Sequence, residues 1–391
     1  MLLRLFIKVS LLISLLPALT SVTAAQEGES DCLSRHELGA KCASRLADLS
    51  MNDIQTVGSH NSYKLAIPEV ELARIRQYRE ASALSLDYSH LTLTNQLDMG
   101  LRQIELDIFY DPEGGRFADP LLPRETSRLY GALPYDGSAM LAPGFKVLHS
   151  QDIDVRSNCP TWIACLNEIK AWSDANPLHV PILIMFNAKE GGSGYPDVEP
   201  ALDFTADAYA ALDAETLSVF PSDRLITPDE VRGEFSSLRQ AVLAGNWPRL
   251  DKARGRVFFA LDESPEKVRV YLRGNESLQG LPLFVNSISE QEEHAAYFTI
   301  NDPIRDQQRI RAAVAAGFIV RTRADANTLE ARENSTTRRQ AAFNSGAQYI
   351  STDYYVPRLE FSDYQVQLPG GQIARCNPVR LPEPCSRAEA P

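Results

Sequence analysis

The sequence has no surplus of positive charge and, beyond its N-terminal region, no long apolar run. Its 391 residues include 39 lysines and arginines against 51 aspartates and glutamates, a formal net charge of −12. Nucleic-acid-binding proteins normally carry a basic patch that neutralises phosphates, so we expect no nucleic-acid partner. A membrane-spanning helix needs about 18 or more apolar residues. We therefore expect no transmembrane segment in the mature chain.

Short repeats and low-complexity tracts are also missing from the sequence. Hydrophobic residues make up 44% of the chain and charged residues 23%, which is typical of a soluble globular protein. This composition excludes a disordered or fibrous chain. The length allows one large domain with a substantial core, and we expect it to be a monomer.

Cysteine is scarce and has the wrong spacing for zinc. The six cysteines fall into three close pairs, Cys32/Cys42, Cys159/Cys165 and Cys376/Cys385. None of these pairs has the two-residue spacing of a zinc knuckle. Disulfides persist in exported proteins, so we expect local pairing, although the sequence does not choose among the possible connectivities.

Residues 1–25 have the features of a secretory signal peptide. Arg4 and Lys8 precede the short apolar run Leu11–Leu19, and Thr23-Ala24-Ala25 offers small residues for cleavage. A membrane anchor is the alternative, but Pro17 interrupts the apolar run. We therefore expect an exported protein, extracellular or, in a Gram-negative bacterium, periplasmic.

Short apolar runs rich in β-branched residues alternate with segments of helical periodicity. The runs are Ile54–Val57, Arg102–Ile108, Lys146–Leu148, Val180–Phe186, Arg256–Leu261, Leu283–Val285, Gly317–Thr322 and Gln348–Thr352. Such an alternation predicts parallel strands that helices cover on both faces. Eight strands favour an α/β fold with a single (β/α)8 TIM barrel. An open doubly wound sheet is the alternative, but no glycine-rich phosphate loop follows the first strand.

Two segments depart from this alternation. Residues 110–144 are rich in Gly and Pro and follow the second run, so we predict a long loop on the active-site face of the barrel. After Phe361 the chain becomes Pro-rich and carries the last cysteine pair. We therefore assign residues 1–25 to a signal peptide, 26–361 to the barrel and 362–391 to a disulfide-strapped tail.

Polar residues follow several of the predicted strands, where a barrel places its chemistry. They are His60, Asn61, Glu105, Asp107, His149, Asn187, Lys189, Arg321, Arg323 and Asp353. Glu105 and Asp107 are two positions apart and share one face of their strand. Together with the amide oxygens of Asn61 and Asn187 they form an all-oxygen set, which suits Ca²⁺ or, second, Mg²⁺ rather than zinc.

Two histidines beside such a metal favour general acid–base catalysis, because the unperturbed pKa of histidine is about 6.5. Lys189, Arg321 and Arg323 would hold a phosphoryl group, and Asp353 completes the predicted substrate-binding set. Each residue alone has a structural alternative, such as a buried histidine, a solvated ion pair or a helix cap. Their joint position at strand ends indicates metal-assisted phosphodiester cleavage.

The combination resembles the catalytic domain of metal-dependent phosphoinositide-specific phospholipase C, and in particular its secreted, calcium-dependent microbial branch. His60-Asn61-Ser62-Tyr63, the Glu105/Asp107 pair and His149 carry this likeness, which spans most of residues 50–356. It implies His60 and His149 as the catalytic pair and Asn61, Glu105 and Asp107 as calcium ligands. Asn187 stands where the familiar animal enzymes have a Glu ligand.

The resemblance also implies a reaction and a substrate. The substrate would be a phospholipid at a membrane surface, whose inositol 2-hydroxyl attacks the phosphate to give a cyclic product. His60 would stabilise the phosphorane, and His149 would protonate the diacylglycerol leaving group.

Three alternatives remain beside this interpretation. Asn187-Ala188-Lys189 and the Cys159/Cys165 pair also resemble sphingomyelinase D and glycerophosphodiester phosphodiesterases. A secreted binding barrel without catalysis is the second alternative. A glycosidase is disfavoured, because the two carboxylates of such enzymes straddle the bond from different strands, whereas Glu105 and Asp107 share one strand.

Overall fold

A computed structural model describes residues 49–132, 134–192 and 198–381. They form an α/β fold with two mixed sheets of five strands, in the orders β10-β1-β9-β8-β7 and β3-β2-β4-β5-β6. The strands are β1 (Ile54–Ser59), β2 (Gln103–Phe109), β3 (Lys146–Val147), β4 (Ile182–Lys189), β5 (Val257–Leu261), β6 (Phe284–Val285), β7 (Tyr297–Thr299), β8 (Ile319–Arg323), β9 (Tyr349–Thr352) and β10 (Ala374–Cys376).

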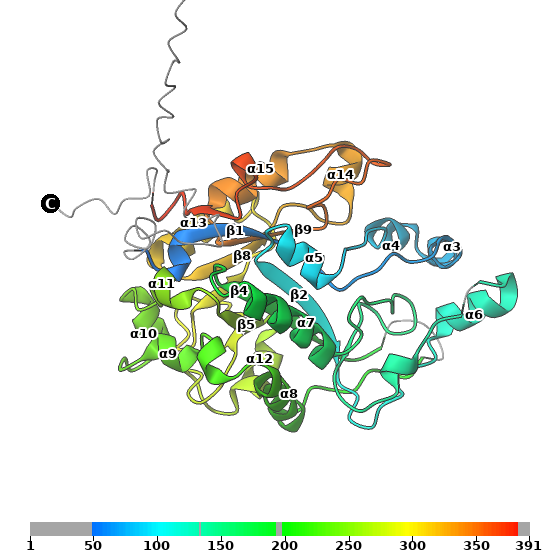
Figure 1. The fold of residues 1–391 in the computed structure, drawn as a ribbon, viewed down its shortest axis with the longest axis horizontal. Coiled ribbons are helices and arrows are strands. Elements are labelled where there is room, and N and C mark those ends of the chain that lie inside the picture. The colour runs from blue at the N-terminus through cyan, green and yellow to red at the C-terminus, as the bar shows by residue number, and fades with distance from the viewer. Residues whose placement is uncertain (1–48, 133, 193–197, 382–391) are drawn as a thin grey trace, which may run out of the picture.

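Helices lie along the outer sides of the two sheets, while α3, α4 and α6 project from one end of the molecule (Figure 1). The α-helices are α3 (Glu69–Tyr78), α4 (Glu80–Ser85), α5 (Leu93–Asp98), α6 (Leu121–Tyr130), α7 (Trp162–Ala175), α8 (Ala206–Val219), α9 (Pro228–Arg232), α10 (Leu238–Leu243), α11 (Leu250–Ala253), α12 (Pro265–Leu272), α13 (Gln307–Ala316), α14 (Leu329–Glu333) and α15 (Thr337–Ser345). Short 3-10 turns occupy Met51–Asp53, Ser138–Met140, Ser222–Arg224 and Pro369–Gly371.

The set of parallel strands differs from the prediction at two positions in the chain. Lys146–Leu148 was expected to be a parallel barrel strand, but β3 pairs antiparallel with the end of β2. Conversely, β7 pairs parallel with β8 although its three residues were not predicted as a strand. Each sheet thus holds four parallel strands and one antiparallel strand, which is β3 in one and β10 in the other.

The two sheets meet at two junctions that are not continuous ladders. At one junction the backbone N of Arg102 donates to the oxygen of Val57 at 2.8 Å. A single parallel bridge between Asn286 and Tyr297 links the other junction. Because hydrogen bonding is interrupted at both places, a complete closed barrel is not confirmed.

The core follows from the composition of the central strands. The apolar positions of β4 and β5 are buried on both sides, as expected for parallel strands that helices cover. Trp162 of α7 packs edge-on against Phe186, with ring centroids 5.4 Å apart. Thr161, which precedes α7, caps it by accepting a hydrogen bond from the backbone N of Ala164.

Two peripheral segments are more ordered than predicted. The Gly- and Pro-rich segment after β2 contains helix α6 and is not a structureless loop. The described part of the C-terminal segment places β10 antiparallel to β1, with Val366 and Leu368 buried. This segment therefore forms an edge strand of the sheet.

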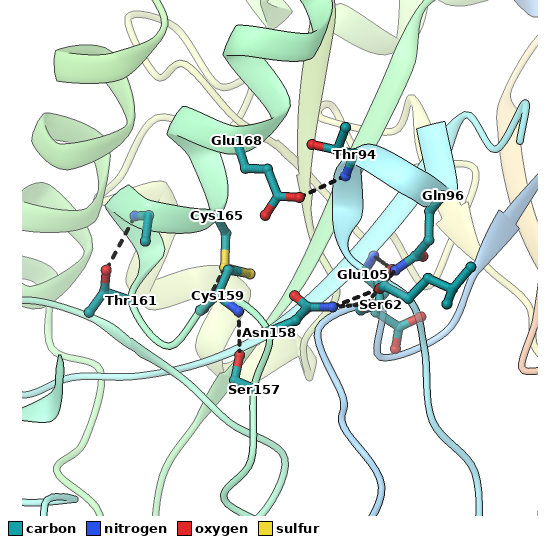
Figure 2. The surroundings of a disulfide bond; sticks show 12 residues. Ser62, Thr94, Gln96, Glu105, Ser157, Asn158, Cys159, Thr161, Cys165 and Glu168 are labelled. Carbon is teal, nitrogen blue, oxygen red and sulfur yellow. Dashed lines mark hydrogen bonds between the residues drawn. A yellow bond between two sulfur atoms is a disulfide. The ribbon is translucent and has the colours of Figure 1, made fainter. Parts of the chain in front are cut away.

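The Cys159–Cys165 disulfide confirms the local pairing expected there, and it lies inside the fold before and within α7 (Figure 2). Cys376 is also disulfide-bonded. The predicted Cys32/Cys42 pair, and Cys385 of the predicted Cys376/Cys385 pair, lie outside the described residues. The signal peptide and the last residues of the tail lie outside the described residues as well. In the described ranges, no helix is long and apolar enough to span a membrane.

Candidate active site

One cavity of about 220 Å³ collects the polar residues at the carboxyl ends of the strands. Its lining comprises His60, Asn61, Glu105, Asp107, His149, Asn187, Lys189, Asp262, Asn301, Arg321 and Arg323. Every predicted site residue except Asp353 is in this set. The two sheets contribute different parts of it, because His60 follows β1 while Glu105 and Asp107 lie on β2.

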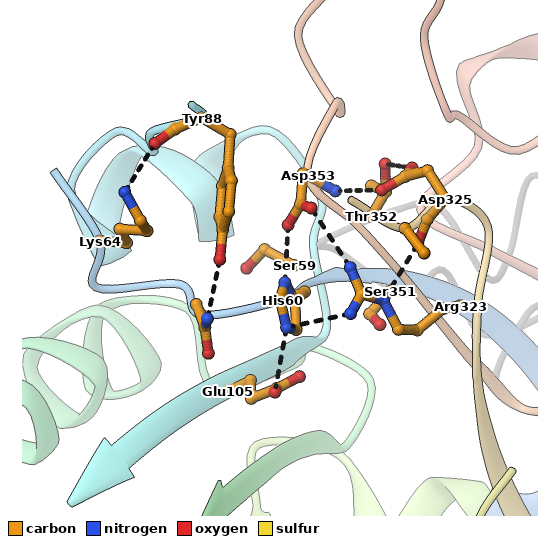
Figure 3. A network of polar contacts seen from close by, with 12 residues as sticks. Ser59, His60, Lys64, Tyr88, Glu105, Arg323, Asp325, Ser351, Thr352 and Asp353 are labelled. Atoms are coloured by element: carbon orange, nitrogen blue, oxygen red, sulfur yellow. Dashed lines mark hydrogen bonds and ion pairs between the residues drawn. The ribbon is translucent and has the colours of Figure 1, made fainter. Parts of the chain in front are cut away.

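His60 is fixed by contacts at both ring nitrogens (Figure 3). Its Nδ1 lies 2.8 Å from Asp353 Oδ1, and its Nε2 lies 3.2 Å from Arg323 Nη1. An arginine can only donate, so Nε2 is the acceptor and Nδ1 carries the proton toward Asp353. Burial, together with the nearby Arg323 and Arg321 charges, lowers the pKa of His60 well below 6.5. His60 is therefore a neutral imidazole with a lone pair on Nε2.

Asp353 was predicted to bind substrate, but in the structure it lies behind His60 rather than in the cavity lining. Arg323 Nη2 donates to Asp353 Oδ2 at 3.3 Å, and the backbone N of Asp353 donates to Asp325 Oδ1 at 2.8 Å (Figure 3). Burial raises the pKa of Asp325 to about 7, and the neighbouring Asp353 charge adds to this effect. Asp325 and Arg323 thus hold the carboxylate that orients His60.

His90 is hydrogen-bonded to the backbone of the same histidine, although it is not among the predicted site residues. Its Nε2 donates to the backbone oxygen of His60 at 2.7 Å, and its ring stacks on Tyr355. Burial lowers the pKa of His90 to about 4. A neutral His90 therefore acts as a fixed donor to the backbone at His60.

His149 has its own carboxylate partner. Its Nδ1 lies 3.0 Å from Asp154 Oδ2, and the backbone N of His149 donates to the backbone oxygen of Asp154 at 3.2 Å. The His149 side chain is 24% exposed, more than the 17% of His60. Both cavity histidines therefore have Nδ1 bound to an aspartate, and Nε2 of His60 is held by Arg323.

The two β2 carboxylates each contact a cation. Arg321 Nη2 donates to Glu105 Oε2, and Lys189 Nζ lies 3.0 Å from Asp107 Oδ2. Burial raises the pKa of Glu105 to about 7, although the Arg321 charge opposes this rise. The backbone of β2 is fixed beside them, because the Glu105 N donates to the Ser62 hydroxyl at 2.8 Å.

The two amides that were predicted as ligands present their oxygens for binding. Asn61 Nδ2 donates to the Tyr88 hydroxyl at 2.7 Å, and Asn187 Nδ2 donates to the backbone oxygen of Asp262. These bonds use the amide nitrogens and leave the carbonyl oxygens for another partner. Asn61 has φ 47°, a left-handed conformation that asparagine tolerates better than most residues.

This donor set fits a hard cation. Asp107 is buried, and its Oδ1 has no hydrogen-bond partner in the described ranges. No group of three or more His, Cys, Asp or Glu side chains is placed for a metal anywhere in the described ranges. Two carboxylates and two amide oxygens are instead the kind of ligand that calcium accepts.

Asp262 and Asn301 line the cavity but were not predicted. Asp262 directly follows β5, and Asn301 lies two residues after β7. Burial raises the pKa of Asp262. Asn301 Oδ1 accepts a hydrogen bond from Arg321 Nη1, which orients this guanidinium. The strand-end rule would have found Asp262 if it had been applied to the fifth strand, and Asn301 if β7 had been recognised.

The loop that carries Asn158 and Cys159 is hydrogen-bonded to the turn after β1 (Figure 2). Asn158 precedes Cys159 and donates to the backbone oxygens of Ser62 at 3.3 Å and Leu91 at 2.8 Å. Gln96 Nε2 donates to the same Ser62 oxygen at 2.7 Å. The turn after β1 is therefore held by two other segments of the chain, which carry Asn158 and Gln96.

Residues 49–378 match the family model described as phosphoinositide phospholipase C, Ca²⁺-dependent. A search of curated proteins found no match.

Solved structures with similar folds include phospholipases from two bacteria. A calcium-dependent phosphoinositol-specific phospholipase C from a Pseudomonas species has a TM-score of 0.53 at 19% identity, over 89% of this chain and 99% of that chain. Its myoinositol complex gives 0.51 at 19% identity, over 85% and 97% of the two chains. A Ca²⁺-dependent phosphatidylinositol-specific phospholipase C from Streptomyces antibioticus gives 0.50 at 17%, over 78% and 95%. At these identities the similarity establishes the fold alone.

Proposed function

The chain belongs to the Ca²⁺-dependent phosphoinositide phospholipase C family, and on that premise we propose that it cleaves phosphatidylinositol-type phospholipids through a cyclic inositol phosphate. One observation carries the proposal. Two histidines, each with Nδ1 on an aspartate, share a cavity with an all-oxygen donor set and three cationic side chains. This arrangement has the groups that an internal attack on a phosphodiester requires.

Asn61, Glu105, Asp107 and Asn187 are the residues that would hold calcium. When bound, the ion supplies positive charge that neutralises phosphate oxygens and lowers the pKa of the attacking hydroxyl. With Asn187 in place of an acid, the donor set has two carboxylates and two neutral amides.

In this proposal His60 takes the proton of the attacking inositol hydroxyl, a role different from the phosphorane stabilisation that the resemblance implies. Its Nδ1–H is directed at Asp353, so the lone pair is on Nε2, toward the cavity. Asp353 would stabilise the imidazolium that forms when Nε2 accepts the proton. Arg323 lies beside Nε2 and would move to the phosphoryl oxygens when substrate binds.

His149 donates a proton to the glycerol oxygen that leaves. Asp154 holds its Nδ1, which directs the Nε2–H of the protonated ring away from that carboxylate. Arg321 and Lys189 line the same cavity and would stabilise the negative charge that develops on the phosphoryl group.

The scaffold and location are part of the same proposal. We propose that the two sheets are halves of one barrel, supported by the bonds at both junctions, and that a signal peptide at residues 1–25 directs export of a monomeric enzyme.

The test is ³¹P NMR of purified protein with phosphatidylinositol in mixed micelles, with calcium and then with a chelator. We expect a cyclic inositol phosphate signal that disappears without calcium. His60→Ala and His149→Ala should each lower kcat by about 10² to 10⁴, the range for general acid–base groups. His294→Gln is the matched control, because His294 bonds to Glu276 and Glu292 and does not line the cavity.

Other outcomes separate the alternatives. Release of choline from sphingomyelin or lysophosphatidylcholine would assign the protein to the sphingomyelinase D type. Release of glycerol phosphate from glycerophosphodiesters would indicate the second enzymatic alternative. No turnover of any of these substrates with calcium present would contradict the enzymatic proposal.

A further inference from the structure

Lys64 has a buried charge that the proposed reaction does not use. It lies four residues after His60, and its side chain is 0% exposed. Its Nζ lies 3.3 Å from Asp154 Oδ2 and donates to the backbone oxygens of Tyr88 at 3.0 Å and Leu65 at 3.4 Å. Burying an ammonium costs free energy unless partners surround it. The oxygens of Asp154, Tyr88 and Leu65 therefore form a specific binding position for the Lys64 ammonium.

Asp154 is shared between Lys64 and His149. The same oxygen, Oδ2, contacts Lys64 Nζ and His149 Nδ1, whereas Oδ1 has no hydrogen-bond partner in the described ranges. Burial would raise the pKa of Asp154, but the Lys64 charge and His149 outweigh burial and lower it. The three side chains thus form a buried chain from cation to carboxylate to imidazole.

We propose that Lys64 is a positioning residue that sets the orientation and proton affinity of His149 through Asp154. The ammonium keeps Asp154 ionised and fixes the oxygen that binds Nδ1. A positive charge beside the His149–Asp154 pair also opposes the addition of a proton to the pair. The benefit to catalysis rests on the proposed function, but the electrostatic effect does not.

Other charged or titratable groups share the cavity with this histidine. They are His60, Glu105, Asp107, Lys189, Asp262, Arg321 and Arg323, with the tyrosines Tyr63 and Tyr88 beside Asp154. All of them are retained when only Lys64 is changed. The difference between wild type and variant therefore isolates the Lys64 charge.

Lys64 has a second connection that the experiment must separate. The backbone oxygen of Tyr88 accepts a hydrogen bond from the Lys64 ammonium, and the Tyr88 hydroxyl accepts one from the Asn61 amide (Figure 3). A change at Lys64 could thus act on a predicted calcium ligand. Calcium affinity, measured by titration calorimetry in each variant, distinguishes this route from the route through Asp154.

The experiment measures the pKa of His149 directly by histidine-selective NMR, with the His149 signal assigned from a His149→Asn variant. In Lys64→Met we expect this pKa to rise by about one pH unit, because a positive charge close to the pair is lost. Lys64→Arg should keep it within a few tenths of the wild-type value. Lys64→Gln provides a second neutral variant that still donates to Tyr88, in case the methionine variant does not fold.

Lys146→Met is the matched control. Lys146 is also a buried lysine near an aspartate, with Nζ 3.4 Å from Asp111 Oδ2 and 3.0 Å from the Gly144 oxygen, but neither of these partners lines the cavity. It should lower stability without moving the His149 pKa. If the enzyme cleaves phosphatidylinositol, the alkaline limb of the kcat profile should move upward only in the neutral Lys64 variants, with KM unchanged. An unchanged His149 pKa in a folded neutral variant overturns the proposal, whatever the activity.

Discussion

Each of the two cavity histidines is held by a carboxylate that does not itself line the cavity. Asp353 binds His60 and Asp154 binds His149. The sequence placed the histidines at strand ends, because strand ends can be read from apolar runs. It did not pair them with their aspartates, since a hydrogen bond between two particular side chains depends on rotamers and loop paths that periodicity does not encode.

Substitution of Asp353 tests the first pair. Asp353→Asn removes the charge that would stabilise a protonated His60 and allows the wrong tautomer. We expect kcat on phosphatidylinositol to fall by at least about 10² while the substrate KM changes little. Asp213→Asn is the control, because Asp213 is also paired with an arginine, Arg273, at a place outside the cavity lining. Equal activity losses in the two variants would contradict a specific role for Asp353.

At the scale of strands and helices, the sequence identified most of the parallel strands but misassigned one and missed another. Lys146–Leu148 has the apolar character of a barrel strand. Apolar character does not show whether a strand runs parallel or antiparallel to its neighbour, and β3 runs antiparallel to β2. The three residues of β7 follow a polar stretch and are too short for a periodicity to develop. Because β7 was not predicted, Asn301, which follows it, was not predicted as a site residue either.

Gly58 in β1 permits the close approach of β1 to β2. A Cβ at this position would lie 2.4 Å from Gln103 Cβ and 2.5 Å from the Gln103 backbone oxygen. Since backbone atoms cannot move aside cheaply, Gly58→Ala should lower the free energy of unfolding by about 1–3 kcal/mol. Urea denaturation followed by circular dichroism measures this loss. If Gly58→Ala has the same free energy of unfolding as the wild type, the two strands can move apart at this position without a loss of stability.

For the whole molecule, the net charge of −12 and an anionic substrate are compatible because the cavity has its own balance of charge. Glu105, Asp107 and Asp262 lie in one cavity with Lys189, Arg321 and Arg323. The sequence-based exclusion of nucleic acid rests on the total charge, whereas phosphate binding depends on these few groups. Composition could therefore describe the surface but not the site.

Calcium should stabilise the folded protein as well as support catalysis. At a concentration 100 times its Kd, a ligand that binds only the native state adds about 2.7 kcal/mol. We expect calcium to raise the Tm of the wild type by several degrees and to have little effect on Asp107→Asn, which lacks one ligand charge. Differential scanning fluorimetry with and without chelator measures both. The same calcium-dependent rise in both proteins would place the ion elsewhere.

The hydrogen bond between His60 and Asp353 joins residues 293 positions apart in the sequence. Because a chain is synthesised from its N-terminus, His60 is made early and its partner is added only after most of translation is complete. An unfinished chain therefore has the histidine without the carboxylate that orients it. The arrangement proposed for catalysis at His60 is thus completed only near the end of synthesis.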